Sequence, residues 1–325
     1  MAHMTNPLAT PDQLCALRHS PNSLPSELAD LVFFQTQCLT QAAGLLLQLP
    51  QSVTAQANVI LARYWLVEGL MSYEFSDVSA ATIFLVSKVS SSPRRPRDVC
   101  NVYAYLLSPS STFLRPPSSP PPVNNPKDYY LSESAFHRFH SRILNLESRI
   151  LYALGFDTHV SLPHPLAITY LQALDFLGTP KQRISQSVLR YLNTALLSPQ
   201  MLYLTSQPNA LAVAAIYSAA KDTGAKMPES EWWEVFDVDR EELGFLVVGM
   251  RSVQGYMDKL REEIPVDGRG KRGLLWRKDV QQEMARRGLE ISIPNNNNNS
   301  TKSGDAEDEM MRLMDEKVAR MEEYD

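Results

Sequence analysis

Apolar residues recur at three- and four-residue intervals from Leu28 to Leu260, which is the spacing of the buried face of an α-helix. Alternation of apolar and polar residues, the pattern of a half-buried strand, is nearly absent, and only 13 of the 325 residues are glycine. The sequence therefore predicts an all-α protein. Helices are expected over residues 27–49, 52–69, 76–90, 97–107, 132–154, 165–177, 181–197, 208–223, 229–236 and 239–264.

Local signals agree with these boundaries. Ser76 and Asp239 carry side chains that can accept hydrogen bonds from the first turn of the third and the tenth helix. The sequence Leu-Gly-Phe at residues 154–156 is typical of a chain that leaves a helix through a left-handed residue, so it closes the fifth helix.

Two segments are too rich in Pro, Ser and Asn to pack in a core. SPSSTFLRPPSSPPPVNNPKD, at 108–128, is expected to be a mobile surface loop, and PNNNNNSTKSGDAEDE, at 294–309, a linker. The last residues, 309–325, carry an apolar stripe and are interpreted either as a helix that seeks a partner or as one that frays in solution.

The chain contains an internal duplication. Five residues of the third helix match five residues of the eighth, each 133 positions further along. The pairs are Ala81 and Ala214, Ile83 and Ile216, Phe84 and Tyr217, Ser87 and Ala220, and Lys88 and Lys221. Small residues at this spacing let neighbouring helices approach closely, so each of the two helices is expected at the centre of its own five-helix unit.

These patterns divide the chain into four parts. They are a flexible N-terminus (1–25), a first helical unit (26–160) with a Pro/Ser-rich insertion (108–131), a second helical unit (161–265) and a C-terminal tail (266–325). The tail is basic at its start, then rich in asparagine, then acidic.

Charge and composition exclude several classes of protein. The net charge is −5, and the segment from Lys302 to Asp325, with nine acidic and four basic residues, accounts for all of it. A near-neutral body implies no general attraction to nucleic acid, so no direct nucleic-acid partner is expected. No apolar run approaches the roughly 18 residues that span a bilayer, so we expect no membrane partner and an intracellular, soluble protein. Cys15, Cys38 and Cys100 have no metal-ligand spacing and are expected to be reduced thiols.

Enzyme motifs are missing as well. The sequence has no phosphate-binding glycine loop, no G-x-S-x-G and no H-E-x-x-H, so no catalytic residue, cofactor or metal is predicted. Glu133, His137 and His140 have helical spacing and are the one alternative, a set of three metal ligands on a helical enzyme. The second such cluster that a di-iron bundle needs is absent from the sequence.

The fifth helix has two distinct faces. One stripe suffices to bury it in its own unit, and comprises Phe136, Phe139, Ile143, Leu146, Ile150 and Leu154. The neighbouring stripe places Glu147 between Leu144 and Leu151. Two interpretations remain open: Glu147 pairs locally with Arg138, Arg142 or another surface charge, or another protein covers this leucine-lined surface.

Lys88 admits the same two interpretations. It ends the third helix after Ala81, Phe84 and Leu85, where a cation also suits the negative end of the helix dipole. If the third and fifth helices pack side by side, Lys88 and Glu147 form one charged pair inside an apolar patch.

Four stretches resemble the transcription and splicing cyclins, with most similarity to the L type. They are GLLLQLPQSVTAQANVILARYW, SAATIFLVSKVSSSPRRPRDVCNVYAYL, LNLESRILYALGFDTHVSLPHPLAITYLQAL and QPNALAVAAIYSAAK, and the resemblance extends over about residues 27–263. It implies two tandem cyclin boxes, over 26–160 and 161–265. It also implies a nuclear regulatory subunit, not an enzyme, that binds and activates a cyclin-dependent kinase, here a PITSLRE-like one, in RNA polymerase II transcription and pre-mRNA processing.

The resemblance also implies roles for individual residues. Lys88 and Glu147 take the places of the lysine and glutamate that bind the kinase backbone at the entry to its αC helix. The kinase-binding residues implied in this way are Leu85, Lys88, Val89, Leu144, Glu147, Leu151 and Phe156. Arg94, Arg95 and Arg97 begin the fourth helix, after a turn set by prolines, and contact of these arginines with phosphate, for instance on a kinase activation loop, is left open.

Three features depart from the family pattern. Ser90 and Ser91 stand where cyclins usually carry two acids after the lysine, which removes negative charge from the interface. The arginine-serine tail of animal cyclin L, which docks splicing factors, is replaced by an asparagine run and an acidic segment. The Met-Arg-Ala-Ile-Leu motif of cell-cycle cyclins is missing from the first box.

A second function remains open, a cyclin-fold transcription factor that binds promoter DNA without a kinase. The basic run GRGKRGLLWRK at 268–278 is interpreted as a nuclear localisation signal or as a solvated turn. Ser20, Ser92, Ser108 and Ser119 precede prolines and so match the minimal target of a proline-directed kinase, although such dipeptides are common in loops.

Overall fold

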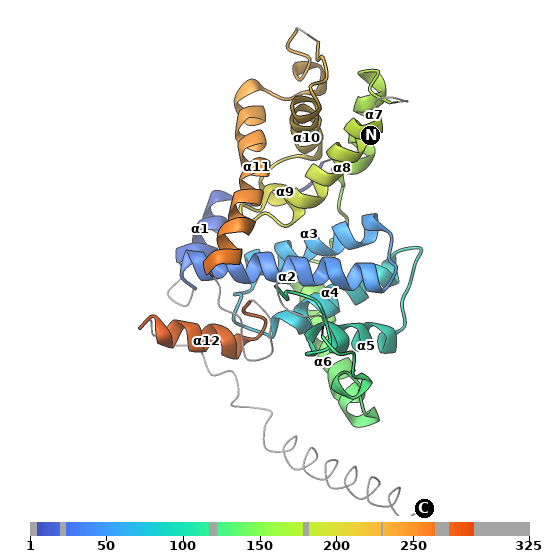
Figure 1. Ribbon diagram of the computed structural model, residues 1–325, viewed down its shortest axis with the longest axis vertical. Coiled ribbons are helices and arrows are strands. Elements are labelled where there is room, and N and C mark those ends of the chain that lie inside the picture. Colours follow the sequence, from blue (N-terminus) through green and yellow to red (C-terminus); the bar gives the residue numbers. More distant parts are fainter. Residues whose placement is uncertain are drawn as a thin grey trace, which may run out of the picture.

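The computed structural model describes residues 5–19, 24–116, 122–177, 182–228, 230–263 and 273–288. Within these ranges the regular structure is entirely helical, which confirms the all-α prediction (Figure 1). The α-helices are α1 (Pro11–His19), α2 (Ser26–Leu46), α3 (Gln51–Val67), α4 (Phe75–Val89), α5 (Pro96–Leu107), α6 (Glu133–Ala153), α7 (Pro163–Ala173), α8 (Gln182–Leu196), α9 (Leu202–Thr205), α10 (Pro208–Thr223), α11 (Arg240–Glu263) and α12 (Arg277–Arg286). Two 3₁₀ turns, η1 (Pro126–Asp128) and η2 (Glu234–Phe236), complete the set. None of the described helices is long and apolar enough to cross a membrane.

The two helices that carry the repeated residues are the central helices of two bundles. Helix α4 packs against α2, α3, α5 and α6, and α10 packs against α7, α8, α9 and α11. Ala81 and Ala214 are both fully buried, as expected of small residues at close helix crossings. The duplication predicted from the sequence is therefore present as two stacked bundles, with the first below the second in Figure 1.

The core of the first bundle combines aromatic packing with a buried hydroxyl chain. The Trp65 ring, from α3, lies 5.8 Å from the Phe33 ring of α2, and 1% of Trp65 is exposed. The Tyr103 hydroxyl lies 2.6 Å from Ser79 Oγ, which in turn lies 2.6 Å from Thr40 Oγ1. This chain links α5, α4 and α2 and satisfies three buried hydroxyl groups.

The N-terminal segment makes specific contacts with both bundles. Asn6 Nδ2 donates to the Ser161 carbonyl at 2.8 Å, and Gln207 Nε2 donates to the Asn6 carbonyl at 3.1 Å. Helix α1 then packs against α3 of the first bundle. Residues 5–19 thus join both bundles, in contrast to the flexible N-terminus expected over 1–25, because their partners lie far away in the sequence where no local pattern reveals them.

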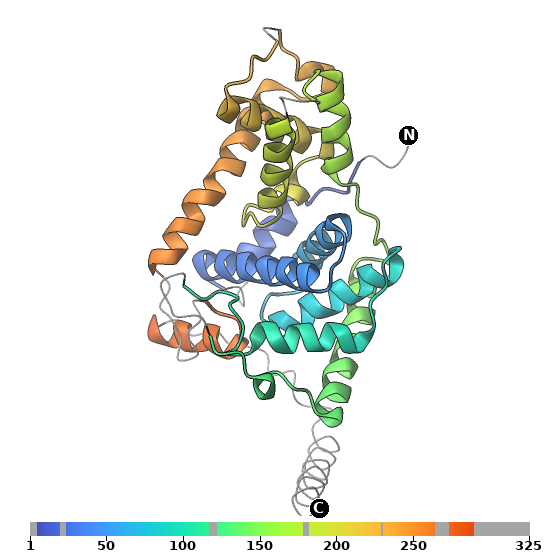
Figure 2. The same ribbon diagram turned by 45° about the vertical axis from the view of Figure 1, so that its right-hand side comes forward.

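Part of the C-terminal tail also packs on the first bundle. Leu275, Val280 and Met284 are buried, and the Leu274 backbone N–H donates to Gln35 Oε1 on α2 at 2.7 Å. Helix α12 lies beside the first bundle in both views (Figures 1 and 2). The tail proposed over 266–325 therefore begins with a packed helix that periodicity did not predict. The Asn-rich linker and the acidic 309–325 segment lie outside the described residues.

Helix ends follow the local signals in two of three cases. Asp239 Oδ1 accepts a hydrogen bond from the Glu242 N–H at 2.7 Å, and Gly155 and Phe156 have φ of 57° and 63°, as predicted. Ser76 does not cap its helix, because α4 begins one residue earlier with Glu74 at the N-cap. The helix expected over 229–236 is reduced to the 3₁₀ turn η2.

The described parts of the Pro/Ser-rich insertion form specific contacts. Ser110 is buried and its Oγ donates to Asp128 Oδ2 at 2.7 Å. The insertion expected to be a mobile loop thus contains a hydrogen-bonded base that closes near η1.

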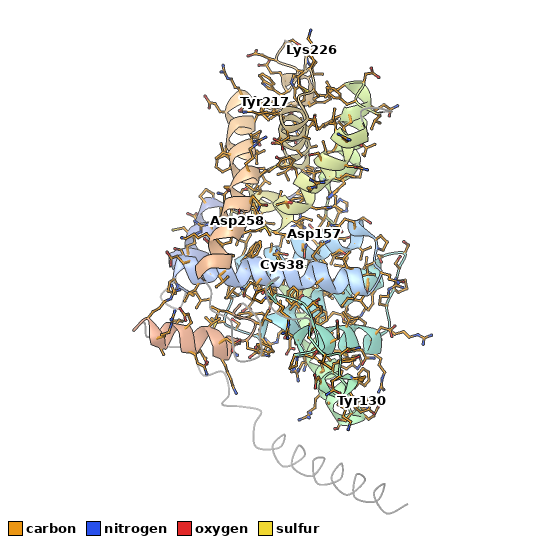
Figure 3. All side chains as sticks on the ribbon, viewed as in Figure 1. Cys38, Tyr130, Asp157, Tyr217, Lys226 and Asp258 are labelled. Carbon is orange, nitrogen blue, oxygen red and sulfur yellow. The ribbon has the colours of Figure 1, made fainter. Side chains whose placement is uncertain are left out.

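The three cysteines are free thiols. Cys38 lies on α2, labelled in Figure 3, where burial raises the pKa of its thiol to about 12. Burial likewise raises the pKa of the Cys100 thiol to about 11, so neither is a reactive thiolate near neutral pH.

Candidate functional site

The end of α4 and the middle of α6 meet in one ion pair. Lys88 Nζ lies 2.5 Å from Glu147 Oε1, and the Lys88 side chain is 45% exposed while that of Glu147 is only 8% exposed. Lys88 Nζ also lies 4.8 Å from the centre of the Phe84 ring. The pair joins the two helices and keeps Glu147, a nearly buried carboxylate, from standing alone.

Glu147 does not pair with Arg142, one of the local partners that the sequence offered. Arg142 Nε instead donates to Asp77 Oδ2 at 2.8 Å, across from α6 to the start of α4. A second ion pair between the same two helices therefore fixes their relative position. Together the two contacts hold Glu147 opposite Lys88.

Lys88 is placed by the way α4 ends. Ser90 N donates to the Val86 carbonyl at 3.0 Å, and the Ser90 hydroxyl donates to the Ser87 carbonyl at 2.9 Å. These bonds satisfy the last carbonyls of the helix, next to which the Lys88 cation is electrostatically favoured. The helix is buried along its length and emerges only at this end.

Several apolar side chains of α6 and of the end of α4 are exposed. Val89 is 64% exposed, Leu144 42% and Phe156 61%, and Leu151 is half-buried beside them. We call the surface formed by Lys88, Val89, Leu144, Glu147, Leu151, Tyr152 and Phe156 the pair face. Large apolar groups left exposed around a nearly buried charged pair are typical of a surface that binds another protein.

Leu85 does not belong to this surface. It is only 3% exposed and packs inside the first bundle, so it offers a partner no contact area in this conformation. Its assignment to kinase binding came from the resemblance to cyclins. At that position α4, the central helix, is covered on all sides.

Tyr152 is a member of the pair face that the sequence reasoning missed. It is 75% exposed, and its ring meets that of Phe156 in a T-shaped contact with centroids 5.4 Å apart. Tyr152 follows Leu151 directly and therefore lies off the stripe of Leu144, Glu147 and Leu151, so helical spacing gave no signal for it.

The backbone at the end of α6 is strained. Phe156 has φ of 63°, a left-handed conformation that is uncommon for a residue other than glycine, and its N–H donates to the Leu151 carbonyl at 2.8 Å. Such a conformation costs on the order of 1–3 kcal/mol and is concentrated at functional sites. Here it accompanies an aromatic side chain that is 61% exposed to solvent.

The three arginines after Lys88 have separate roles. Arg94 Nε donates to the Leu47 carbonyl at 2.8 Å and a second guanidinium nitrogen donates to the Gln48 carbonyl at 2.9 Å, which caps the end of α2. Arg97 pairs with Glu133 at 2.7 Å. Only Arg95, which is exposed and forms no side-chain hydrogen bond or ion pair within the described ranges, remains available to phosphate.

This assignment gives a stability prediction for Arg94. Arg94→Gln removes charge-assisted hydrogen bonds to two carbonyl groups, so the free energy of unfolding should fall by about 1–3 kcal/mol. Arg95→Gln is the matched control and should change it by less than about 0.5 kcal/mol. Urea denaturation gives the free energy of unfolding of both variants, and an equal loss in the two would show that Arg94 does not cap α2.

The histidine cluster on α6 is engaged in ring contacts. The His140 ring stacks on Phe136 with centroids 5.6 Å apart, and His137 Nε2 lies 3.4 Å from Glu133 Oε1. Within the described residues, no group of three His, Cys, Asp or Glu side chains is placed to hold a metal ion.

The paired five-helix bundles define the class of protein. The structure matches a chain of the yeast RNA Pol II CTD kinase CTDK-1 complex with a TM-score of 0.62 and 15% identity, over 90% of this chain and 86% of that chain. It matches a viral cyclin from herpesvirus saimiri with a TM-score of 0.50 and 15% identity, over 71% and 86%. At such low identity these similarities show the fold alone, which is that of cyclins.

Sequence comparison adds the family. No family model matches the chain. Human Cyclin-L2 is 30% identical over 249 residues, which are 73% of this chain and 45% of that protein, and human Cyclin-L1 is 33% identical over 221 residues, 68% and 38%. The chain belongs to the cyclin family, and these relatives are of the L type. It spans less than half the length of the curated relatives it matches.

Proposed function

We propose that this chain is the nuclear regulatory subunit of a cyclin-dependent kinase of the transcription class, and that it performs no catalysis itself. The observation that carries the proposal is the Lys88–Glu147 pair, held at 2.5 Å within a rim of exposed apolar side chains. The names of the sequence relatives, Cyclin-L1 and Cyclin-L2, and the kinase complex among the structural matches support it. The similarity to the L type makes a PITSLRE-type kinase, with a role in pre-mRNA processing, the specific partner we propose.

The mechanism is a shift of population in the kinase. A protein kinase is active when its β3 lysine pairs with the glutamate of its αC helix. A subunit that contacts the αC-in state better than the αC-out state moves the equilibrium towards the active form, by as much as its affinities for the two states differ. The pair face supplies such a contact without any chemical step of its own.

The two components of the pair face have different tasks. Covering Val89, Leu144, Tyr152 and Phe156 removes apolar area from water, which drives association. Lys88 and Glu147 add directional hydrogen bonds to the partner's backbone, which fix the orientation of the kinase helix. The left-handed Phe156 holds its ring in place before binding, so less conformational entropy is lost in the complex.

The promoter-binding alternative finds less support in the basic residues. Arg94 and Arg97 are committed to contacts within the first bundle. Of the basic run at 268–278, residues 268–272 lie outside the described residues, and Leu275 packs against the first bundle, so the apolar part of the run has a structural role. Strong, salt-dependent binding of the chain to DNA would nevertheless favour the alternative.

The proposal is tested by disrupting the apolar rim. Leu144→Asp places a charge in the apolar surface that is proposed to cover the kinase helix. Binding to the catalytic domain of a PITSLRE-type kinase should therefore fall at least about tenfold, and kinase activation should fall with it. Val248→Asp, at a 69% exposed apolar residue of α11, is the matched control and should bind like the parent chain. Equal binding by the parent chain and Leu144→Asp contradicts the proposal, as does the absence of kinase binding by the parent chain.

A further inference from the structure

The loop that follows Lys88 contains a serine in an unusual setting. Residues 90–95 read Ser-Ser-Ser-Pro-Arg-Arg and connect α4 to α5. The Ser90 hydroxyl bonds to the end of α4 and accepts a hydrogen bond from the Ser92 N–H at 3.1 Å. Ser92 is half-exposed, and its own hydroxyl forms no hydrogen bond within the described residues.

The other Ser-Pro and Thr-Pro dipeptides within the described residues lack this combination of an accessible side chain and an unengaged hydroxyl. Ser108 is 5% exposed and its hydroxyl donates to the Tyr105 carbonyl at 2.8 Å, and Ser198 is 1% exposed. Thr10 is exposed, but its hydroxyl oxygen caps α1 by accepting from the Gln13 N–H at 3.2 Å. Ser20, Ser119 and Thr179 lie outside the described residues. Of the dipeptides that the structure describes, Ser92-Pro93 therefore has the accessible, unengaged hydroxyl.

The surrounding chain suits a kinase that requires proline after its target. A residue before proline is disfavoured from helical conformations, and Ser92 lies in the bend that follows α4. Two cationic residues follow Pro93 directly, of which Arg95 is exposed and has an extended backbone, with φ of −69° and ψ of 144°. Ser92 thus combines a following proline, a place outside the helices and nearby positive charge.

We propose that Ser92 is a phosphorylation site for a proline-directed serine/threonine kinase. In this reaction Ser92 Oγ forms a bond to the γ-phosphorus of ATP, the bond from that phosphorus to the β–γ bridging oxygen breaks, ADP leaves, and the hydroxyl proton is released. The product carries a charge of about −1.5 to −2 at neutral pH. Arg95, three residues further along the chain, is exposed and forms no side-chain hydrogen bond or ion pair within the described residues, so it is available to pair with the phosphate.

The position of Ser92 gives this modification a consequence, which rests on the proposed function. The hydrogen bonds of the loop hold Ser92 within one turn of the end of α4, where added negative charge is opposed by the helix dipole. The phosphate also competes with Glu147 for the 45% exposed Lys88 side chain. Phosphorylation of Ser92 therefore weakens the pair face and lowers the affinity for the partner kinase.

The first measurement decides the site without any reference to the partner. The full chain is incubated with ATP and a proline-directed cyclin-dependent kinase that is already active with its own cyclin, and phosphate is located by mass spectrometry. Phosphate is expected on Ser92 in the parent chain and in Ser108→Ala, and at no described dipeptide in Ser92→Ala. Absence of phosphate from Ser92, or equal incorporation at Ser108, overturns the proposal.

The second measurement tests the consequence. The phosphorylated and mock-treated chains are titrated with the PITSLRE-type catalytic domain, and the phosphorylated chain should bind at least about tenfold more weakly. Ser92→Ala, treated in the same way, should bind like the mock-treated parent. Unchanged affinity after phosphorylation overturns the regulatory role. If the mock-treated parent binds no kinase, the proposed function and the regulatory role fall together, while the mass spectrum still decides the site.

Discussion

Glu147→Ala should lower the affinity of the chain for its kinase by well over tenfold and leave the fold intact. Removing one partner of a charged pair that becomes buried at an interface costs about 2–5 kcal/mol of binding energy, and each 1.4 kcal/mol is a factor of ten in affinity. The fold should survive because Lys88, at 45% exposure, can be hydrated once Glu147 is gone, and because the Arg142–Asp77 pair still joins α6 to α4.

The control for Glu147→Ala lies on the same helix. Glu133 forms an exposed ion pair with Arg97, so Glu133→Ala removes an acid from α6 away from the pair face. Calorimetric titration of both variants with the PITSLRE-type catalytic domain compares them, and circular dichroism checks the fold. If the two variants bind alike, Glu147 has no special role in kinase binding.

Trp65→Ala should cost the chain about 3–5 kcal/mol of stability, the typical loss when a large buried aromatic residue is truncated. Trp65 is 1% exposed and packs against Phe33, so the substitution leaves a cavity between α2 and α3. These helices form the surface on which α4 packs. The first bundle, and with it the position of Lys88, should therefore loosen.

Val67→Ala separates this core effect from a general effect on α3. Val67 belongs to the same helix and is 57% exposed, so its truncation should change the free energy of unfolding by less than about 0.5 kcal/mol. Urea denaturation followed by circular dichroism gives both values. A loss below about 1 kcal/mol for Trp65→Ala would mean that the core around Phe33 differs from the one described.

The helices of the two bundles could be predicted because their pattern is local. Apolar spacing identified α2 to α8, α10 and α11, and the match of Ala81 to Ala214 identified the duplication. Helix α12 has polar residues at most positions and is held by contacts such as that of Leu274 with Gln35, 239 positions away. Contacts over that distance leave no periodic signal in the sequence. The contacts of Asn6 with Ser161 and Gln207 leave none either.

The pair face could be predicted only in part. The sequence suggested Lys88 because this cation ends an apolar helix, and Glu147 because this acid lies between two leucines of one stripe. The resemblance to cyclins then assigned both residues to one kinase-binding site. Leu85 was assigned through the resemblance to cyclins, and in the structure it is buried because α4 is a central helix covered on all sides. Tyr152 was missed because it lies off the stripe of Leu144, Glu147 and Leu151, and its ring contact with Phe156 is visible only in the structure.

The claim that most needs testing is that the kinase covers the pair face. Hydrogen–deuterium exchange of the chain, alone and saturated with the PITSLRE-type catalytic domain, measures this without any substitution. Binding should slow exchange in the segments that contain Lys88 to Ser92 and Leu144 to Phe156, and leave exchange in α11 unchanged. Slower exchange in the second bundle alone, with the α4 and α6 segments unaffected, would contradict the account.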